Sequence, residues 1–307
     1  MAVHGQQRQV SSPVAGYVFD GAALRTIAGV PGGATLGGAM DLGLAASAVV
    51  VSPQLDSAIA TANDGSLHLF RVSGQSATEV WWNGLPSAPA RAVYSPSGKA
   101  AAVYASGRVQ VFTGLPNAPL LVFAAEIGLS QTEPGRKPTG AAPEAMAVSD
   151  DAAWLLVASE GRLRLLGASG SSRGLLDGAR EVSVAFASGG HAAAVLNGAG
   201  PWLDVYPDVS ADPTQRIAAL GLAEPAGLAY TPDGKFVVAA ARADKSVTVF
   251  DLAAGAAATL DCNCAPTGVT RMGKLFRLTD AGSGPVWMVD TTASPARIVF
   301  VPARAQP

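Results

Sequence analysis

The sequence is short of charge and of long apolar runs, and each shortage excludes a class of protein. Charged residues make up 14% of the chain, and 21 Lys and Arg oppose 23 Asp and Glu, for a net charge of −2. Because no basic field attracts a polyanion, nucleic acid is not an expected partner. No stretch approaches the roughly 18 consecutive apolar residues of a membrane span, so no membrane insertion is predicted.

Histidine is also scarce, and the three residues, His4, His68 and His191, are scattered. No two of them have the spacing of metal ligands, so neither a zinc site nor a Ser-His-Asp site is expected from them. The phosphate-loop pattern GxxxxGK[ST] is absent. The glycine-rich stretch 29–38 precedes no predicted helix whose N-terminus would meet a phosphate, and we interpret it as a connector.

Cysteine occurs twice, as Cys262 and Cys264. Cysteines at this spacing rarely reach relaxed disulfide geometry within one strand, so two free thiols are predicted, with a strained disulfide or a redox or metal role as alternatives. They do not determine the compartment. The start of the chain has no apolar segment after a basic one, which predicts a cytoplasmic protein, or an exported or periplasmic one if a signal is missing from the given start.

A repeat is what the sequence does contain. Residues 230–252 read YTPDGKFVVAAARADKSVTVFDL, and residues 94–112 read YSPSGKAAAVYASGRVQVF, with Tyr, Pro, Gly and Lys at matching places. The frames that open such segments are, in chain order, ASAVVVS, PARAVYS, PEAMAVS, EVSVAFA, PAGLAYT and PTGVTRM. They begin at residues 46, 89, 143, 181, 225 and 266, an average spacing of 44 residues. A fixed period in this range indicates a repeat architecture.

Each unit contains four short strand patterns in the same order. The opening strand is followed by a turn, a second apolar strand such as 236–240, and a polar corner. A strand with period-two alternation, such as SVTVF, comes next, and a fourth segment such as 256–260 closes the unit. Four short antiparallel strands in tandem units predict an all-β fold, a β-propeller of four-stranded antiparallel blades. The alternative is a β-sandwich, which also has regularly spaced strands.

The number of blades depends on the N-terminus. Six units are complete, and residues 16–29 add a hairpin whose YVFDG resembles a third strand and whose LRTIAG resembles a fourth. We predict that this hairpin is the outer half of another blade, which favours seven blades over six, and that it clasps the ends of the ring. The predicted boundaries are a tail at 1–13, one propeller domain at 14–303 and a tail at 304–307.

The segment beginning at Tyr230 resembles the repeats of the bacterial YVTN-type and lactonase-like propellers. Those repeats carry a Pro-Asp-Gly turn, an apolar strand, a kink, and a strand that ends on Asp, as YTPDGKFVVAAARADKSVTVFDL does. The likeness extends to residues 94–112, and elsewhere it is a pattern of residue types. It implies a propeller, a fold that hosts unrelated functions, and it carries no catalytic motif onto this chain.

The corners between second and third strands hold the candidate ligand-binding residues. In a propeller these corners and the connections between blades lie on one face, around the mouth of the central channel. A ring of carboxylate and amide oxygens there suits a cation such as Ca²⁺ or a polyhydroxylated ligand. The alternative is that the backbone of a tight turn requires Asp and Asn, as we expect for Asp233 on the opposite face. The candidate ring is Asp64, Glu160, Asn197, Asp244 and Asp280. No other cofactor is expected.

Two further features suggest contact surfaces. The connection between residues 123 and 143 is longer than the others, and Glu133, Arg136 and Lys137 make it a candidate partner-binding loop, with an ordinary surface insertion as the alternative. Trp81 and Trp82 are adjacent on an outer strand, so alternation sends one between the blades and leaves the other exposed.

Two functional classes are compatible with these patterns. The first is a non-catalytic binding or scaffold propeller, expected to be a monomer, that recognises a protein or glycan partner on the channel-mouth face. The second is a lactonase-like hydrolase that uses the corner carboxylates as metal ligands or as general acid and base. Because no catalytic set can be assigned, the binding role is the prediction.

Overall fold

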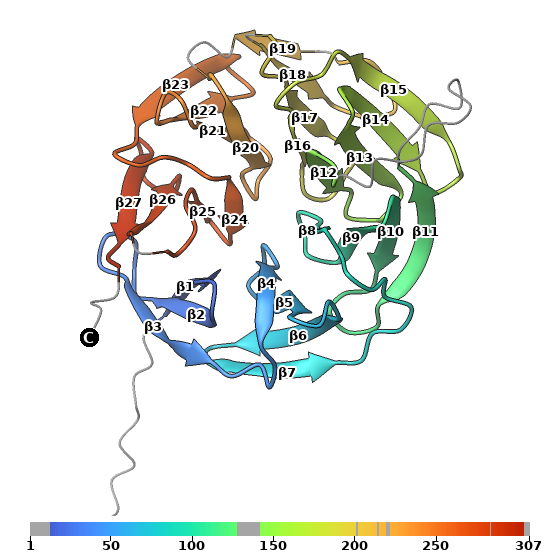
Figure 1. Cartoon of the computed structure of the whole chain (residues 1–307). Helices are drawn as coiled ribbons and strands as arrows, with labels where there is room; N and C mark the ends of the chain where they lie inside the picture. Colours follow the sequence, from blue (N-terminus) through green and yellow to red (C-terminus); the bar gives the residue numbers. More distant parts are fainter. Residues whose placement is uncertain are drawn as a thin grey trace, which may run out of the picture.

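The computed structural model describes residues 13–127, 142–200, 202–213, 215–218, 222–282 and 284–303. Over these residues the chain forms seven antiparallel sheets that surround a central axis as blades (Figure 1). The predicted propeller, with seven blades, is therefore confirmed, and the β-sandwich alternative is wrong. The described part of the chain has no helix long and apolar enough to cross a membrane.

Blade 1 is a three-stranded sheet, and blades 2 to 7 are four-stranded sheets whose strands pair in chain order. Blade 1 consists of β1 (Val14–Phe19), β2 (Leu24–Ala28) and β3 (Thr35–Met40). Blade 2 consists of β4 (Ala46–Val51), β5 (Ser57–Ala62), β6 (Leu67–Ser73) and β7 (Ser76–Val80). Blade 3 consists of β8 (Arg91–Tyr94), β9 (Ala100–Ala105), β10 (Arg108–Thr113) and β11 (Leu120–Glu126). Blades 4 and 5 consist of β12 (Ala145–Val148), β13 (Trp154–Ser159), β14 (Arg162–Gly167), β15 (Ser172–Asp177); β16 (Ser183–Phe186), β17 (Ala193–Leu196), β18 (Trp202–Tyr206) and β19 (Gln215–Ala218). Blades 6 and 7 consist of β20 (Pro225–Tyr230), β21 (Phe236–Ala241), β22 (Ser246–Asp251), β23 (Ala256–Asp261); β24 (Thr270–Met272), β25 (Leu275–Arg277), β26 (Val286–Asp290) and β27 (Arg297–Val301).

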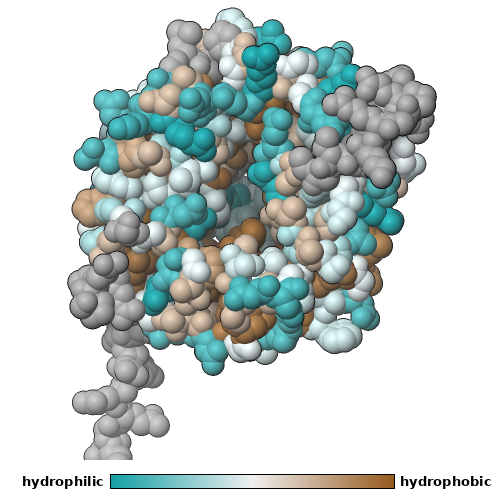
Figure 2. Space-filling view, viewed as in Figure 1, coloured by the Kyte–Doolittle hydropathy of each residue, from teal (hydrophilic) through white to brown (hydrophobic). Residues whose placement is uncertain are grey.

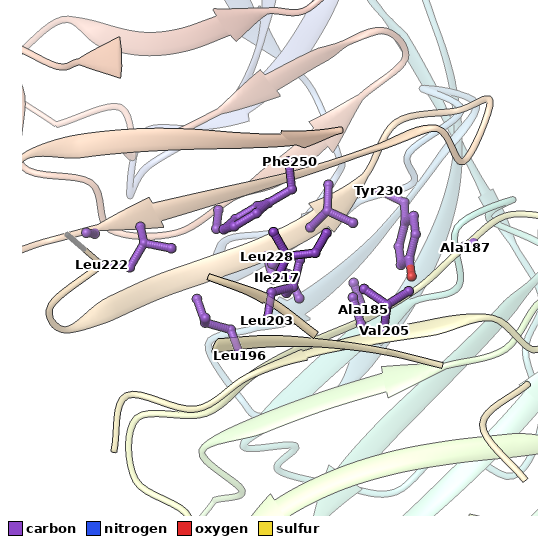
Figure 3. Close-up of a cluster of buried hydrophobic side chains, with 14 residues drawn as sticks. Ala185, Ala187, Leu196, Leu203, Val205, Ile217, Leu222, Leu228, Tyr230 and Phe250 are labelled. Atoms are coloured by element: carbon purple, nitrogen blue, oxygen red, sulfur yellow. The ribbon is translucent and has the colours of Figure 1, made fainter. Parts of the chain in front are cut away.

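The core is divided among the interfaces between blades. Alternating side chains of each strand point to the two neighbouring blades, so both faces of a blade are covered and its central strands are apolar. Seven clusters of buried side chains result, one at each blade interface. Figure 3 shows the one in which Leu228, Tyr230 and Phe250 of blade 6 pack on Leu196 and Val205 of blade 5.

The recurring Ser or Thr that ends the opening frame has a structural role. It is buried at the start of the turn, where its side-chain oxygen accepts a hydrogen bond from the first N–H of the second strand or the residue before it. The N–H of Ala100 donates to Ser95 Oγ at 3.1 Å, and that of Phe236 to Thr231 Oγ1 at 3.1 Å. Asp233 accepts the Thr231 hydroxyl at 2.7 Å, so its predicted role in the turn is confirmed.

The prediction for the N-terminal hairpin is wrong in one respect. β1 and β2 are the inner strands of blade 1, because β1 contacts the innermost strands β4 and β24 of the two neighbouring blades. The stretch 29–38 is also more than a connector, since its end belongs to β3. The period-two pattern of a strand carries no information on how far that strand lies from the axis. The resemblance of YVFDG and LRTIAG to third and fourth strands therefore led to a wrong assignment of the hairpin to the outer half.

The ring closes without exchange of strands among the described residues. Each blade is built from one continuous segment, and the N-terminal hairpin lies between blades 7 and 2, so the prediction that it joins the ends of the ring is confirmed. Closure comes from side-chain packing, in which Val18 and Ile27 of blade 1 meet Met272, Val286 and Met288 of blade 7. This interface therefore depends on apolar burial, like the six others.

The tryptophan prediction is confirmed and the cysteine prediction is wrong. Trp82 is 8% exposed and meets the Phe112 ring edge to face at 4.9 Å between centroids, whereas Trp81 is 81% exposed. Cys262 and Cys264 form a disulfide in the connection between blades 6 and 7, where both side chains are buried. The two residues lie beyond β23, so the geometry of a regular strand does not constrain them.

Candidate functional site

A cavity of about 1330 Å³ occupies the central channel. Its wall is made by the innermost strands of blades 2 to 7, which are β4, β8, β12, β16, β20 and β24. Figure 2 shows the hollow at the centre of the ring. We name the two ends of the channel by what surrounds them. The turn face carries the turns between first and second strands, and the corner face carries the second-to-third corners and the connections between blades.

Arg271 closes the channel at the turn face. This residue of β24 in blade 7 is 7% exposed, and its guanidinium donates to the carbonyl of Pro96 in blade 3 and to the Ser188 hydroxyl in blade 5, the latter at 3.2 Å. Because blades 3 and 7 lie on opposite sides of the ring, the side chain spans the channel (Figure 1). Burial lowers the pKa of Arg271, and the charge of Asp150 partly opposes this shift.

Other hydrogen bonds join the turns around Arg271. Asp150 of blade 4 accepts the N–H of Ser97 in blade 3 at 2.6 Å and that of Gly189 in blade 5 at 2.8 Å. The N–H of Gly273 in blade 7 donates to the Pro53 carbonyl in blade 2 at 2.8 Å. Turns from five blades are therefore linked across the turn face, and hydrogen bonds to a charged group are among the stronger ones.

Among the described residues, the corner-face end of the cavity is open and charged. Its rim is formed by exposed residues of both signs: Glu144, Glu160, Arg162, Asp177, Arg180, Glu181 and Arg242. Arg162 approaches Asp177 at 3.5 Å. Within the described residues, the guanidinium groups of Arg180 and Arg242 contact no carboxylate. Over the described residues the cavity is therefore a funnel, which Arg271 bridges at the turn face and which is open at the corner face.

Arg91 places a further positive charge in the wall of the funnel. Its guanidinium donates to the carbonyls of Pro143 at 2.8 Å and Glu144 at 2.7 Å, on the neighbouring blade. Burial lowers the pKa of Arg91 because it penalises the charged form. Backbone carbonyls solvate this charge in the place of a carboxylate, so an anionic or strongly polar ligand group is well suited to this wall.

The predicted corner residues lie on the corner face, but only Glu160 lines the cavity. The other four accept hydrogen bonds from their own corner or from the connection that leads into their own blade. Asp64 accepts the Ser66 N–H at 2.8 Å, Asn197 the Arg180 N–H at 3.1 Å, Asp244 the Ala223 N–H at 2.7 Å, and Asp280 the Thr267 hydroxyl at 3.1 Å. No group of three His, Cys, Asp or Glu within the described residues could hold a metal ion. Glu133, Arg136 and Lys137 lie outside the described residues.

Sequence reasoning missed two features of the structure. Arg271 occupies the repeat position of Tyr94 and Tyr230, one residue before the turn, and the frame PTGVTRM contained that signal. The second feature is a hydrogen-bonded cluster of Ser66, His68 and Glu79 in blade 2. Period-two alternation places the first two on one face of the blade, but only the strand register brings Glu79 to them.

Comparison with known proteins identifies the fold and no family. No family model matches the sequence, and no curated protein matches it. Among solved structures, a functionally unknown protein from Desulfotomaculum acetoxidans aligns with a TM-score of 0.60 at 13% identity, over 94% of this chain and 99% of that one. Kuenenia stuttgartiensis hydrazine synthase aligns with a TM-score of 0.57 at 13% identity, over 98% of this chain and 99% of that one. The resemblance to YVTN-type and lactonase-like propellers stays a prediction, and the chain is similar to these structures as a β-propeller.

Proposed function

We propose that the corner face of the protein is that of a non-catalytic binding or scaffold propeller, and that it recognises a protein or glycan partner. The observation that carries this proposal is the funnel, which Arg271 bridges at one end and which the described residues leave open at the other. A partner that uses the channel enters from the corner face. A cavity of about 1330 Å³ accommodates a projecting segment of the partner rather than a whole domain.

The charges of the rim support the same direction of approach. Arg180 and Arg242 expose guanidinium groups that are not neutralised by contacts within the described residues, and Glu160 and Glu181 lie on the same rim. Guanidinium groups offer several fixed donors, so they suit carboxylates and polar groups of a partner. In this proposal Glu160 contacts the inserted segment. Asp64, Asn197, Asp244 and Asp280 lie further out, and we propose Glu133, Arg136 and Lys137 as further contact residues for the partner.

The hydrolase alternative has less support. It requires at least two corner carboxylates to converge on one substrate or metal ion. Asp64 accepts a hydrogen bond within its own corner, and Asp244 and Asp280 accept one from the connection before their blade, so each carboxylate supports its local backbone fold. A calcium-binding version of the proposal meets the same objection.

Charge reversal on the two faces tests the proposal. The double variant Arg180→Glu/Arg242→Glu reverses two charges on the rim, and Lys99→Glu/Lys274→Glu makes the matched change at exposed lysines of the turn face. Partners are captured on immobilised wild-type protein, identified, and titrated by calorimetry against all three proteins. We expect the rim variant to bind at least about tenfold more weakly and the turn-face variant to bind like the wild type. Equal affinity of the two variants would contradict the proposal.

A further inference from the structure

A hydroxyl, an imidazole and a carboxylate meet in blade 2, outside the funnel. Ser66 directly precedes β6, and its carbonyl accepts the Ala62 N–H at 2.8 Å, which extends the strand pairing by one residue. His68 lies two residues further along β6. Glu79 of β7 is opposite Phe70. Side chains two residues apart share a face, and so do directly opposite residues, so all three side chains lie on one face of the blade.

The atoms that meet are those of a nucleophile, a base and an orienting acid. Ser66 Oγ lies 2.8 Å from His68 Nε2, and His68 Nδ1 lies 2.6 Å from Glu79 Oε1. A carboxylate can only accept hydrogen bonds, so the Nδ1 atom carries the proton that Glu79 accepts. The Nε2 atom of the neutral ring is then left as the acceptor for the Ser66 hydroxyl. The imidazole is therefore held in the tautomer that nucleophilic catalysis needs.

Two comparisons within the chain show which parts of this arrangement are ordinary. Polar pairs between third and fourth strands recur in other blades, for example Asp204 with Arg216 at 2.6 Å, so the His68–Glu79 pair has structural counterparts. The turn Asp208-x-Ser210 repeats the geometry of Asp64-x-Ser66. Asp208 accepts the Ser210 N–H at 2.9 Å and its hydroxyl at 2.7 Å, against 2.8 and 2.6 Å for Asp64 and Ser66. Blade 2 differs because its turn hydroxyl also meets an oriented imidazole.

We propose that Ser66, His68 and Glu79 form a nucleophile–base–acid triad that hydrolyses small activated esters at the surface of blade 2. Ser66 and His68 touch the reacting atoms and are the catalytic residues, whereas Glu79 acts through His68 as a positioning residue. The His68 side chain is 27% exposed and none of the three residues lines the funnel. The substrates are therefore small esters with a good leaving group, which demand the least binding and the least stabilisation of the oxyanion.

The chemistry balances with water as the only co-reactant. Ser66 Oγ attacks the ester carbonyl carbon, a C–O bond forms, and the hydroxyl proton moves to His68 Nε2. The tetrahedral adduct collapses, the bond to the leaving alcohol breaks, and that alcohol takes the proton from Nε2. Water then attacks the carbonyl carbon of the acyl-Ser66 ester, and His68 Nε2 takes a proton from that water. The C–O bond to Ser66 breaks, Ser66 Oγ takes the proton from Nε2, and the carboxylic acid is released.

Asp64 sets the scale of the expected activity. Its Oδ1 atom accepts the Ser66 hydroxyl at 2.6 Å, so it competes with His68 Nε2 for the same proton. In the structure the hydroxyl donates to Asp64, so its proton must turn toward His68 Nε2 before Ser66 can attack. When His68 takes the proton during attack, its ring becomes positively charged. The nearby carboxylates of Asp64 and Glu79 stabilise this imidazolium. We expect a reactive serine with slow turnover.

The test compares two serines of the same intact protein. A fluorophosphonate reporter labels an activated serine when the Oγ–P bond forms and fluoride leaves, and peptide mapping measures the labelling rates of Ser66 and Ser210 separately. We expect Ser66 to react at least about tenfold faster than Ser210, whose hydroxyl bonds to the same kind of carboxylate but to no imidazole among the described residues. His68→Gln should slow labelling of Ser66 about 100-fold, the usual contribution of a general base. Ser66→Ala should abolish turnover of p-nitrophenyl acetate, and Ser210→Ala should leave it unchanged.

Glu79 is tested by non-additivity. Glu79→Gln should slow the labelling of Ser66 in the wild-type background and have no further effect in the His68→Gln background, because it acts only through His68. Equal labelling of Ser66 and Ser210, or labelling that is insensitive to His68→Gln, would overturn the proposal. The wild-type comparison of the two serines needs no variant to fold. The binding proposal uses different residues and a different assay, so either proposal can fail without the other.

Discussion

The turn face and the corner face are built from the same repeat, yet their polar side chains are used differently. At the turn face Asp150 and Arg271 bond to backbone groups of other blades. At the corner face Asn197 and Asp244 bond to the connections that lead into their own blades, and Arg180 and Arg242 remain exposed. One end of the channel therefore contributes to the cohesion of the ring. The other keeps its charged groups accessible, as a binding surface requires.

The ends also differ in what a mutation removes. A polar group that links two or three blades supports interfaces that are far apart in the sequence, whereas a group that caps its own corner supports one loop. Removing the first kind leaves polar partners in two blades without their hydrogen bonds, and removing the second leaves one exposed backbone group to water. Four changes test this difference, and they are given in order of decreasing effect on stability.

The largest effect is expected from Arg271→Ala. The substitution removes the hydrogen bonds to Pro96 and Ser188 across the channel, and hydrogen bonds to a charged group contribute roughly 1.5–3 kcal/mol each. Burying a guanidinium that has no carboxylate partner costs free energy in the folded protein, and removing the side chain removes that cost. We therefore expect a net loss of about 3 kcal/mol in the free energy of unfolding, measured in urea. Arg271→Met is the control that keeps the volume, and it should recover only the packing share of the loss. A change within 0.5 kcal/mol for Arg271→Ala, by the same principle, would contradict a linking role.

Asp150→Ala should have the second largest effect. It leaves the N–H groups of Ser97 and Gly189 without their carboxylate, at a cost of about 2 kcal/mol. The matched control is Asp177→Ala on the corner-face rim, whose exposed pair with Arg162 at 3.5 Å contributes no more than about 0.5 kcal/mol. Urea unfolding of the two variants compares the ends of the channel directly. If both variants lose the same stability, the distinction between the two ends is wrong.

The stability contributed by Asp151, which follows Asp150 in the same turn of blade 4, is expected to depend on pH. Burial acts to raise the pKa of Asp151, but hydrogen bonds from the Ser149 hydroxyl, His191 and the Ala153 N–H outweigh it and lower the pKa to about 2. The unfolded value is about 3.9, so the stabilisation is complete above roughly pH 5 and is lost as the pH falls toward 2.

The carboxylate is half exposed, so this stabilisation should stay below about 1 kcal/mol. Asp151→Asn removes the titration, and the difference in urea midpoint between wild type and variant should shrink as the pH falls through this window. If the difference in urea midpoint between wild type and Asp151→Asn stays constant from about pH 5 to about pH 2, the titration of Asp151 does not contribute to stability.

The smallest effect is expected from Asp244→Ala at the corner face. The variant loses one exposed hydrogen bond, from the Ala223 N–H at 2.7 Å, and we expect a loss of about 0.5 kcal/mol. Hydrogen exchange at the Ala223 amide should accelerate while the exchange of the turn-face amides of Ser97 and Gly189 stays unchanged. Accelerated exchange at both faces would mean that the corner is coupled to the whole ring.

The repeat was legible from the sequence because each unit must solve the same local problem. The hydroxyl at Ser95, Ser149 or Thr231 is required to close a turn, and alternating apolar residues are required to cover two neighbouring blades. Such requirements recur at a fixed spacing, so they appear as a pattern. The burial of Trp82 and the exposure of Trp81 followed from the same alternation.

The site was less legible because its parts come from different repeats. Arg271 and Pro96 are 175 residues apart, and nothing in the local pattern of either residue indicates that they meet. The predicted corner ring placed its residues on one face, but their side chains turned toward their own backbones. His68 was set aside because no second histidine had ligand spacing, whereas its partners proved to be Ser66 and Glu79.

By itself the sequence determined the all-β class, the period of the units, the order of strands within them and the side of each strand that is buried. These properties depend on residues a few positions apart, where the chain's own geometry decides. Only the tertiary structure decided which strands of blade 1 lie innermost, which end of the channel is closed, and which side chains meet across blades. Those outcomes depend on the closure of the ring, which brings distant residues together by a geometry that no single repeat contains.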